Sequence, residues 1–268
     1  MIKKRHKVKT LNNYNLKIIA TFSMLVDHIA KIILVPWLYL KISPINHNFD
    51  LYKKLFEIDF AQFGRISMPI FAFLLTEGFK HTKNFKKYLL TMIFMAFLSE
   101  PIYDISIHFL RGKIDETYPF YFQAQNILFS FSLGLMMMWG LKKIKNKYTN
   151  QYISIFLSLA LISTCALISH YLKFDYGWYI ILIIACFYIL SFNKYLQALS
   201  FITLYIIYNQ TFPSIFIFIT CILILLYNGQ KGKLNSKYFF YIFYPAHLLI
   251  LHIIALLSIY KNSLELFF

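Results

Sequence analysis

Two adjacent ionisable residues, Asp27 and His28, lie in the middle of an apolar stretch that runs from Leu16 to Leu38. This stretch is long enough to cross a bilayer, which takes about 20 apolar residues. An ionisable side chain near the middle of a membrane costs roughly 2.5 to 3.5 kcal/mol, so it needs a partner, a wet cavity or a chemical task. An imidazole, with an ordinary pKa of about 6.5, can take up and return a proton at neutral pH. His28 is therefore our candidate general base.

Lys17 precedes His28 by eleven residues. At about 100° per residue the two side chains fall within about 20° of each other, on one face of a helix. That face has a cation near one membrane surface and an imidazole deep in the membrane. Asp27 lies about 100° around the helix, so the spacing leaves open whether it orients His28 or binds Arg65 or Lys31.

The second apolar stretch, 64–79, also carries ionisable residues, with Arg65 at its expected outer end and Glu77 at its inner end. Pro69 between them removes a backbone donor and can kink the helix. Each residue has a structural alternative, since Arg65 can extend to the interface and Glu77 can pair with Lys80 or Lys17. Together with the first stretch, they predict a polar pocket between two helices.

Polar residues at the expected outer surface form a second group. Glu100 and Asp104 end the third apolar stretch at helical spacing, and Asn126 enters the fourth. Tyr176 lies in an aromatic turn, DYGWY. These residues are candidates for orienting an acceptor. The alternatives are a solvated rim for the acids, helix–helix hydrogen bonds for Asn126 and interfacial anchoring for Tyr176.

Two further features lie near the C-terminus. The sequence NGQKGK places Asn228, Gly229, Gly232 and Lys233 in a basic turn, where glycines allow backbone N–H groups to approach a phosphate. In the last apolar stretch, a Tyr–Pro pair that includes Tyr244 precedes His247. His247 is a second candidate base, with a hydrogen-bonded core histidine as the alternative.

The composition defines the class of protein that must position these residues. The 268 residues are 59% hydrophobic and only 14% charged, whereas soluble domains have about 25% charged residues. We therefore expect an all-α, polytopic integral membrane protein with about nine transmembrane helices, eight to ten being possible. The expected spans are about 16–38, 64–79, 85–100, 123–141, 151–172, 176–192, 195–209, 213–227 and 238–260. Without an internal linker or repeat, 1–268 forms a single domain, with a basic tail at 1–14.

The distribution of charge predicts the orientation. With nine spans, the tail and four alternate connections carry Lys and Arg but no acid, so we place them and the N-terminus in the cytoplasm of a plasma-membrane protein. The C-terminus is then extracytoplasmic. A net charge of +16 does not indicate nucleic acid, because the cations lie in short clusters between apolar stretches. The three cysteines lie in apolar runs without CxxC spacing, and we expect no metal. The oligomeric state is not assigned.

The chain resembles the TraX family, named for the protein that acetylates the N-terminus of F-type pilin. The resemblance runs in order from about Asn15 to Ile254, through NLKIIATFSMLVDHI, GRISMPIFAFLLTEGFKHTKN, LSEPIYD, QNILFSFSLGL, DYGWY, LLYNGQKGK and YFFYIFYPAHLLIL. It is similar, more distantly, to transmembrane acyltransferases, in which a basic residue precedes a catalytic His by about eleven positions, as Lys17 precedes His28. Their second-span pattern resembles Arg65, Pro69 and Phe71, and their late aromatic–His segment resembles Tyr244 and His247. The Asp before the His matches the TraX pattern, whereas the wider group varies there.

The resemblance implies an acyl-CoA-dependent acetyltransferase that moves an acetyl group from cytoplasmic acetyl-CoA to an extracytoplasmic peptide N-terminus or surface glycan. The implied catalytic residues are His28, Asp27, Arg65 and Glu77, and the implied donor site comprises Lys17, Asn228, Gly229, Gly232 and Lys233. Because no Ser or Cys stands in a nucleophile motif, direct transfer in a ternary complex is favoured. A small proton-coupled transporter and a non-catalytic assembly factor are the alternatives. The basic inner face and the lack of an inverted repeat argue against the transporter.

Overall fold

The structure is a computed structural model that describes residues 10–35, 61–110, 124–232 and 237–265. In these ranges the backbone is helical, apart from turns and two isolated bridges that join Leu11 to Tyr227 and Gln125 to Phe174. The all-α prediction is therefore confirmed for the described part of the chain. The elements are α1 (Asn13–Ile29), η1 (Ala30–Leu34), α4 (Ala61–Gly64), α5 (Ser67–His81), α6 (Phe85–Leu110), α7 (Ile127–Lys147), α8 (Gln151–Tyr171), α9 (Gly177–Ile189), α10 (Lys194–Asn209), α11 (Ile215–Leu226) and α12 (Lys237–Glu265).

Among the described residues, four helices are long and apolar enough to cross a membrane, over Phe85–Ser106, Ile127–Lys147, Gln151–Tyr171 and Phe239–Ser258. Helices α9 and α11 are apolar but shorter. α1 is not among the four, since it has 17 residues before η1 and carries Lys17 and Asp27. Each of the nine expected spans overlaps a helix, but nine crossings remain a prediction.

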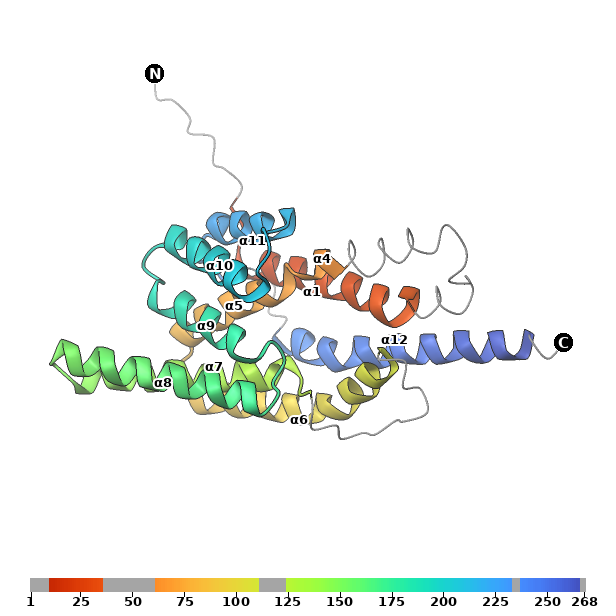
Figure 1. Cartoon of the computed structure of the whole chain (residues 1–268), viewed down its shortest axis with the longest axis horizontal. Coiled ribbons are helices and arrows are strands. Elements are labelled where there is room, and N and C mark those ends of the chain that lie inside the picture. Colours follow the sequence, from red (N-terminus) through yellow and green to blue (C-terminus); the bar gives the residue numbers. More distant parts are fainter. Residues whose placement is uncertain (1–9, 36–60, 111–123, 233–236, 266–268) are drawn as a thin grey trace, which may run out of the picture.

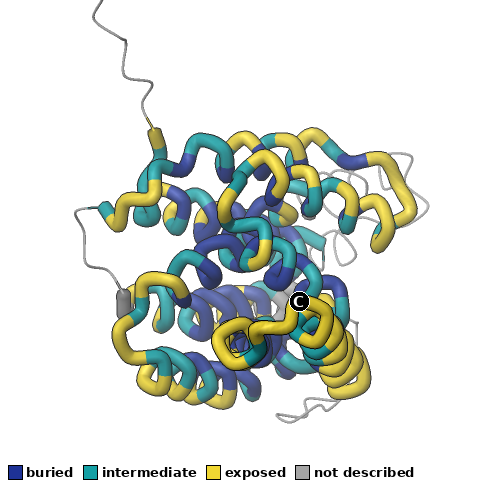
Figure 2. Tube along the Cα trace, turned by 90° about the vertical axis from the view of Figure 1, so that its left-hand side faces the viewer, coloured by how far each residue is buried: buried dark blue, intermediate teal, exposed yellow. Residues whose placement is uncertain are grey.

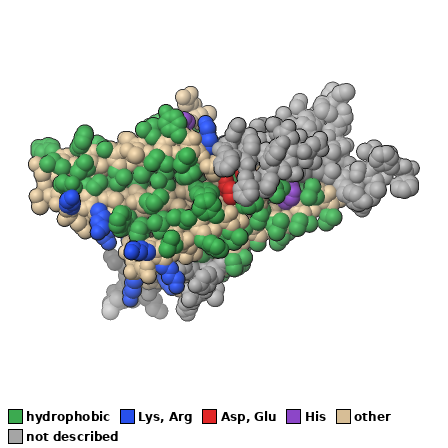
Figure 3. All heavy atoms as spheres, turned by 90° about the horizontal axis from the view of Figure 1, so that it is seen from below, with side chains coloured by type: hydrophobic (Ala, Val, Ile, Leu, Met, Phe, Trp, Pro, Cys, Tyr) green, Lys and Arg blue, Asp and Glu red, His purple; other side chains and the backbone are tan. Residues whose placement is uncertain are grey.

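The distribution of apolar side chains fits a lipid environment. Only 17% of the apolar window of α8 is buried, and Tyr152, Phe156 and Leu159 of this helix are exposed. In Figure 3, hydrophobic side chains cover much of one face, while Lys and Arg gather toward one end of it. Such a large exposed apolar surface is unfavourable in water and indicates association with a membrane.

Asparagine side chains cap the N-termini of several helices. Asn12 and Asn15 form a reciprocal capping box at the start of α1, with N–H···O distances of 2.9 and 3.2 Å. Helices α7, α8 and α10 are capped by Asn126, Asn150 and Asn193, respectively. In each case the side-chain oxygen accepts a hydrogen bond from a backbone N–H of the first turn. A cap replaced by Ala typically costs about 1 kcal/mol. These caps therefore fix where each helix begins.

The helices pack around a shared interior. α1 contacts α4, α5 and α12, and α12 in turn contacts α6, so that α12 lies between α1 and α6 (Figure 1). On the other side of α5, Phe73 packs edge-on against Phe187 of α9 and against Tyr227, at centroid distances of 5.9 and 5.3 Å. Figure 2 shows buried residues in the middle of the assembly and exposed ones on its outer surfaces. Residues from both ends of the chain thus meet in one interior.

Candidate functional site

A cavity of about 720 Å³ lies among α1, α5, α6 and α12. Its lining includes both Lys87 and Tyr103 of α6. These residues are sixteen positions apart, which corresponds to about 24 Å along a helix. One end is basic, with Lys17, His81, Lys87 and Lys231, and the other contains Asp175, Tyr176 and Tyr244. The cavity is therefore long enough to extend over most of a bilayer core, which is roughly 30 Å thick.

His28 lines this cavity between its two ends and contacts His247 of α12. Nδ1 of His28 lies 2.7 Å from Nε2 of His247, and the two rings stack with centroids 4.9 Å apart. Nδ1 of His247 lies 2.7 Å from the backbone oxygen of Phe243. The two histidines were separate candidates in the sequence, and the structure joins them in one pair.

The hydrogen-bond partners determine where the protons lie in a neutral pair. The Phe243 oxygen can only accept, so Nδ1 of His247 must donate, and its Nε2 is left as an acceptor. Nδ1 of His28 must then donate to that Nε2. Nε2 of His28 is consequently unprotonated, which is the state that a general base requires.

Asp27 is turned toward Lys31 rather than toward His28. Its Oδ2 lies 2.7 Å from the Lys31 ammonium, which the π-helical turn η1 places one turn further along. Among the described residues, Oδ1 of Asp27 is buried without a hydrogen-bond partner, and Asp27 also lines the cavity. Of the partners left open by the sequence, the structure therefore gives Lys31.

Gly64 allows α4 to approach Asp27 closely. A Cβ atom at Gly64 would lie 2.4 Å from the Cβ of Asp27 and 2.5 Å from its Cγ. Next to it, the Ser23 hydroxyl donates to the backbone oxygen of Phe63 at 2.6 Å. The start of the GRISMP motif is therefore a contact surface for the Asp27 side of α1.

Arg65 contacts α10. It is exposed, its guanidinium donates to the hydroxyl of Tyr205 on α10, and it lies 5.8 Å from the centroid of that ring. It is not among the described residues that line the cavity. Its implied catalytic role stays a prediction, and its contact with Tyr205 ties α4 and α5 to α10.

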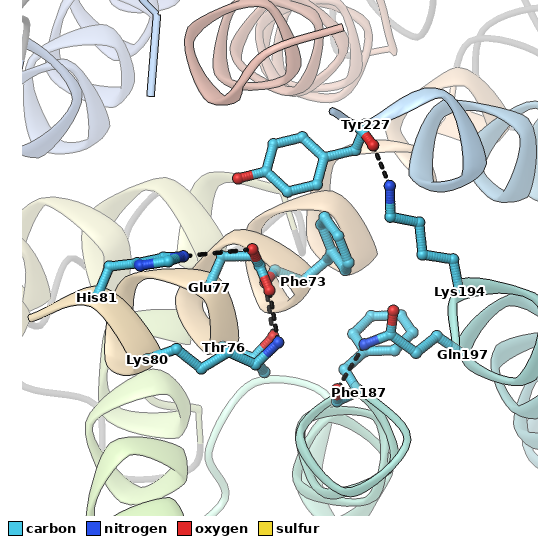
Figure 4. A network of polar contacts seen from close by, with 9 residues as sticks. All are labelled: Phe73, Thr76, Glu77, Lys80, His81, Phe187, Lys194, Gln197 and Tyr227. Carbon is cyan, nitrogen blue, oxygen red and sulfur yellow. Dashed lines mark hydrogen bonds and ion pairs between the residues drawn. The ribbon is translucent and has the colours of Figure 1, made fainter. Parts of the chain in front are cut away.

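Glu77 lies at the basic end of the cavity and is paired there. Its carboxylate lies 2.7 Å from Lys80 and 3.9 Å from His81, both on the same helix (Figure 4). The ring of Tyr227 lies beside this group in the figure, and Lys194 donates to the Tyr227 backbone oxygen. Glu77 lines the cavity together with His81 and Tyr227. The pairing of Glu77 with Lys80, one of the two partners expected for it, is confirmed.

The expected donor turn also reaches the basic end. Lys17, Gly229 and Lys231 line the cavity there, and Gly229 has a φ of 77°, in the left-handed region that favours glycine. The amide of Asn228 instead donates to the Thr10 hydroxyl at 3.2 Å and so holds the turn to the start of the chain. A Cβ at Gly232 would lie 2.9 Å from Oδ1 of Asn12. Lys233 lies outside the described residues.

The opposite end of the cavity is formed by the turn between α8 and α9. Tyr176 has a φ of 61°, a left-handed conformation that is uncommon for a residue with a side chain. The backbone of Asp175 is fixed by the Gln125 oxygen at 2.8 Å and by the Ser130 hydroxyl at 2.9 Å. Burial raises the pKa of the Asp175 carboxyl to about 6. Asp175 and Tyr176 thus form a fixed polar edge.

Glu100 and Asn126 contact each other, but outside the cavity lining. The Asn126 backbone N–H donates to Glu100 at 3.1 Å, its amide also donates to Glu100, and its side-chain oxygen accepts from Leu128 at 3.0 Å. These contacts are those of a helix cap that joins α6 to α7. Asp104 is buried and is likewise not among the lining residues.

Comparison with known proteins gives a family match over most of the chain. The family model described as TraX protein matches residues 13–255. A curated relative, the "Probable fimbrial assembly protein FimC, serogroup H1" of Dichelobacter nodosus, is 27% identical over 258 residues, which cover 89% of this chain and 93% of the relative. No solved structure matches.

Proposed function

This chain belongs to the TraX family, and we propose that it is a membrane acetyltransferase that uses the His28 cavity. The acetyl group comes from cytoplasmic acetyl-CoA and passes to an extracytoplasmic acceptor. The observation that carries this proposal is the continuity of the cavity, which leads from a basic end past His28 to the Asp175 edge. Donor and acceptor can then meet at one imidazole from opposite sides of the membrane.

The chemistry assigned to His28 is general acid–base catalysis. Nε2 takes a proton from the acceptor amine or hydroxyl as that group attacks the thioester carbonyl. The tetrahedral intermediate then loses CoA thiolate, which takes the proton back from Nε2. The acetyl group ends on the acceptor, free CoA thiol is the second product, and His28 returns to its starting state.

His247 acts in this scheme as a positioning residue. By accepting from Nδ1 of His28 at 2.7 Å, it holds Nε2 in the unprotonated form. When His28 takes up a proton, the same contact becomes a hydrogen bond from a cation, which is stronger than one between neutral groups. The Phe243 oxygen, 2.7 Å from His247, stabilises the positive charge shared by the pair.

The basic end is assigned to the donor. Acetyl-CoA carries several phosphates, and Lys17, Lys87 and Lys231 line this end of the cavity. The carboxylate of Glu77 is already paired with Lys80, which limits its repulsion of phosphate. Gly229 presents backbone without a side chain next to these cations. The thioester would then point inward along α1 toward His28.

The acceptor is assigned to the Asp175 end. Carboxylate and tyrosine hydroxyl groups can orient either an amine or a sugar hydroxyl, so both a peptide N-terminus and a surface glycan fit. The name of the relative, a fimbrial assembly protein, favours a surface-protein subunit. This assignment requires the predicted topology of about nine crossings in the plasma membrane, with the N-terminus in the cytoplasm and the C-terminus outside.

The name of that relative also favours the second candidate function, a non-catalytic assembly factor for surface proteins. The two functions differ in a direct assay. Purified protein in lipid nanodiscs is given radiolabelled acetyl-CoA with and without an acceptor peptide, and both CoA thiol release and peptide mass are measured. A non-catalytic assembly factor should release no CoA thiol above the rate measured without protein. A transporter, reconstituted in sealed liposomes instead of nanodiscs, should take up labelled substrate without transferring the acetyl group.

Substitution of His28 tests the catalytic assignment. His28→Ala should leave acetyl-CoA binding nearly intact and lower turnover by roughly 10²- to 10⁴-fold. His28→Gln should fail almost as badly, because an amide keeps some hydrogen bonding but cannot accept the proton. His170→Gln, at an exposed histidine on α8, is the matched control and should retain activity. Near-normal turnover per folded protein in His28→Gln would reject the assignment.

A further inference from the structure

A second cavity, of about 830 Å³, lies at the lysine-rich end of α7. It is bounded by the end of α5, the turn into α6 and the last turns of α7. Its apolar lining includes Phe79, Phe85, Trp139 and Ile144. The rings of Phe85 and Trp139 stack at 5.8 Å with only 3° between their planes, which gives the cavity a flat aromatic floor.

Cations surround this floor. Lys83, Lys142, Lys143 and Lys147 line the cavity, and no Asp or Glu is among the described residues that do so. The Lys143 ammonium lies 5.4 Å from the centroid of Trp139. The three lysines from α7 are exposed and extend from the helix end. The site thus combines an apolar base with an uncompensated positive rim.

The site lies where the headgroups of a bilayer would be. Tryptophan is enriched at the membrane interface, and Trp139 lies three residues before Lys142, the first of these lysines. Toward the membrane interior, α6 exposes Leu90 and Phe94, which are both 64% exposed, and α7 exposes Met136. The sequence predicts that this end faces the cytoplasm. A ligand here can therefore keep its acyl chains in lipid and its phosphate at the lysines.

We propose that this cavity binds the headgroup of an anionic phospholipid of the inner leaflet. The phosphate lies among Lys142, Lys143 and Lys147, and the glycerol region packs on the Phe85–Trp139 floor. A soluble phosphate would use the lysines but not the apolar floor, which is why the lipid is the better fit. Thr82 lines both cavities, so they adjoin, but the lysines of α7 do not line the His28 cavity, and this site therefore uses cations other than those of the proposed donor site.

Trp139 provides a local probe of the bound lipid. The chain has 3 tryptophans, so Trp37→Phe and Trp178→Phe leave Trp139 as the single fluorophore. The protein is placed in phosphatidylcholine nanodiscs that contain a small fraction of brominated phosphatidylglycerol or, for comparison, brominated phosphatidylcholine. Bromine quenches tryptophan on contact, so a bound anionic lipid should quench Trp139 at a lower mole fraction than the neutral lipid does.

Two double variants with equal charge change test the lysines. Lys143→Gln with Lys147→Gln, both in the cavity, should lower the apparent affinity for brominated phosphatidylglycerol by roughly 5- to 30-fold. Lys86→Gln with Lys145→Gln, exposed residues outside the lining, should leave it nearly unchanged. Circular dichroism and size-exclusion chromatography establish that both variants are folded.

Three outcomes would overturn the proposal. Equal quenching by the two brominated lipids would mean that the site has no preference for an anion. An equal loss in both double variants would mean that general surface charge, and not the cavity, attracts the lipid. Relief of quenching by soluble glycerol phosphate or CoA, at concentrations comparable with the lipid headgroups, would assign the cavity to a soluble phosphate. Failure of acetyl transfer would not affect any of these measurements.

Discussion

The contact between His28 and His247 makes a quantitative prediction for substitutions at His247. His247→Ala removes the group that accepts from Nδ1 of His28 at 2.7 Å. Either nitrogen of His28 can then carry the proton, and the imidazolium formed during transfer loses its stabilising partner. Turnover should fall, while acetyl-CoA binding at the basic end should change little.

The size of the effect follows from the charged state of that bond. A hydrogen bond to a charged group contributes roughly 1.5 to 3 kcal/mol. Since 1.36 kcal/mol corresponds to a tenfold change in rate, removal of His247 should lower turnover by roughly 10- to 150-fold. This loss is smaller than that expected for His28→Ala, because His247 touches neither the donor nor the acceptor in the proposed scheme.

Two further substitutions separate hydrogen bonding from packing. His247 also stacks on Phe243, with centroids 4.8 Å apart, so its loss affects the interior as well. Gln at this position can accept from His28 but cannot stack, whereas Phe can stack but cannot accept. Turnover, the pH dependence of turnover and thermal unfolding are measured for Ala, Gln and Phe variants in nanodiscs.

Our reasoning predicts that Gln restores turnover to within about tenfold of the original and that Phe restores thermal stability without turnover. The pH profile should shift in the Phe variant, because His28 no longer has an acceptor for its Nδ1 proton. Full activity of His247→Phe, with an unchanged pH profile, would refute the positioning role. His247 would then be a packing residue, and a contact other than the one with His247 would have to determine the tautomer of His28.

Three other predictions follow. Gly64→Ala should destabilise the protein by roughly 1 to 3 kcal/mol, measured by thermal unfolding, because its Cβ would lie 2.4 Å from that of Asp27. The pKa of Asp175 is raised from 3.8 to about 6, so the folded chain holds this proton more tightly than the unfolded chain does. The free energy of unfolding should therefore decrease as the pH rises from 4 to 6, and this decrease should be absent in Asp175→Asn. Lys231→Gln with Lys233→Gln should weaken acetyl-CoA binding by roughly 1 to 3 kcal/mol, more so at low salt.

Short-range patterns predicted the parts of the site that lie on one helix. Lys17 and His28 were expected on one face of α1, and both line the same cavity. Lys31 follows Asp27 by four residues, the spacing of neighbours on a helix surface, and the pair is formed at 2.7 Å. Helical periodicity is a property of adjacent residues, and so it can be read directly from the sequence.

Contacts between distant segments could not be predicted in this way. No periodicity relates His28 to His247, which are 219 positions apart. Each was identified by its polarity in an apolar stretch, but their pairing depends on how α1 and α12 pack. Asp175 was not among the candidate residues, because the left-handed backbone of Tyr176 beside it has no signal in residue type.

Asn126 illustrates a signal that was present but read differently. An asparagine directly before an apolar helical run is a typical N-cap. We considered Asn126 as a candidate for orienting an acceptor, with helix–helix hydrogen bonds as the alternative, and the structure shows the alternative. In the structure its side-chain oxygen accepts a hydrogen bond from the Leu128 N–H, and its amide N–H groups donate to Glu100 and to the backbone oxygen of Ala96. Cap chemistry therefore explains both Asn126 and the buried Glu100.

The long separation of His28 from His247 has a consequence for biosynthesis. The ribosome adds about 5 to 20 residues per second, so the 219 positions between them correspond to roughly 10 to 45 s. During that interval α1 is already made, and its imidazole has no α12 to accept its proton. A similar delay applies to the bridge between Leu11 and Tyr227, and Tyr227 lines the cavity. The nascent α1 must therefore wait in a wet or protein-shielded place, such as an insertion channel, until the last helix arrives.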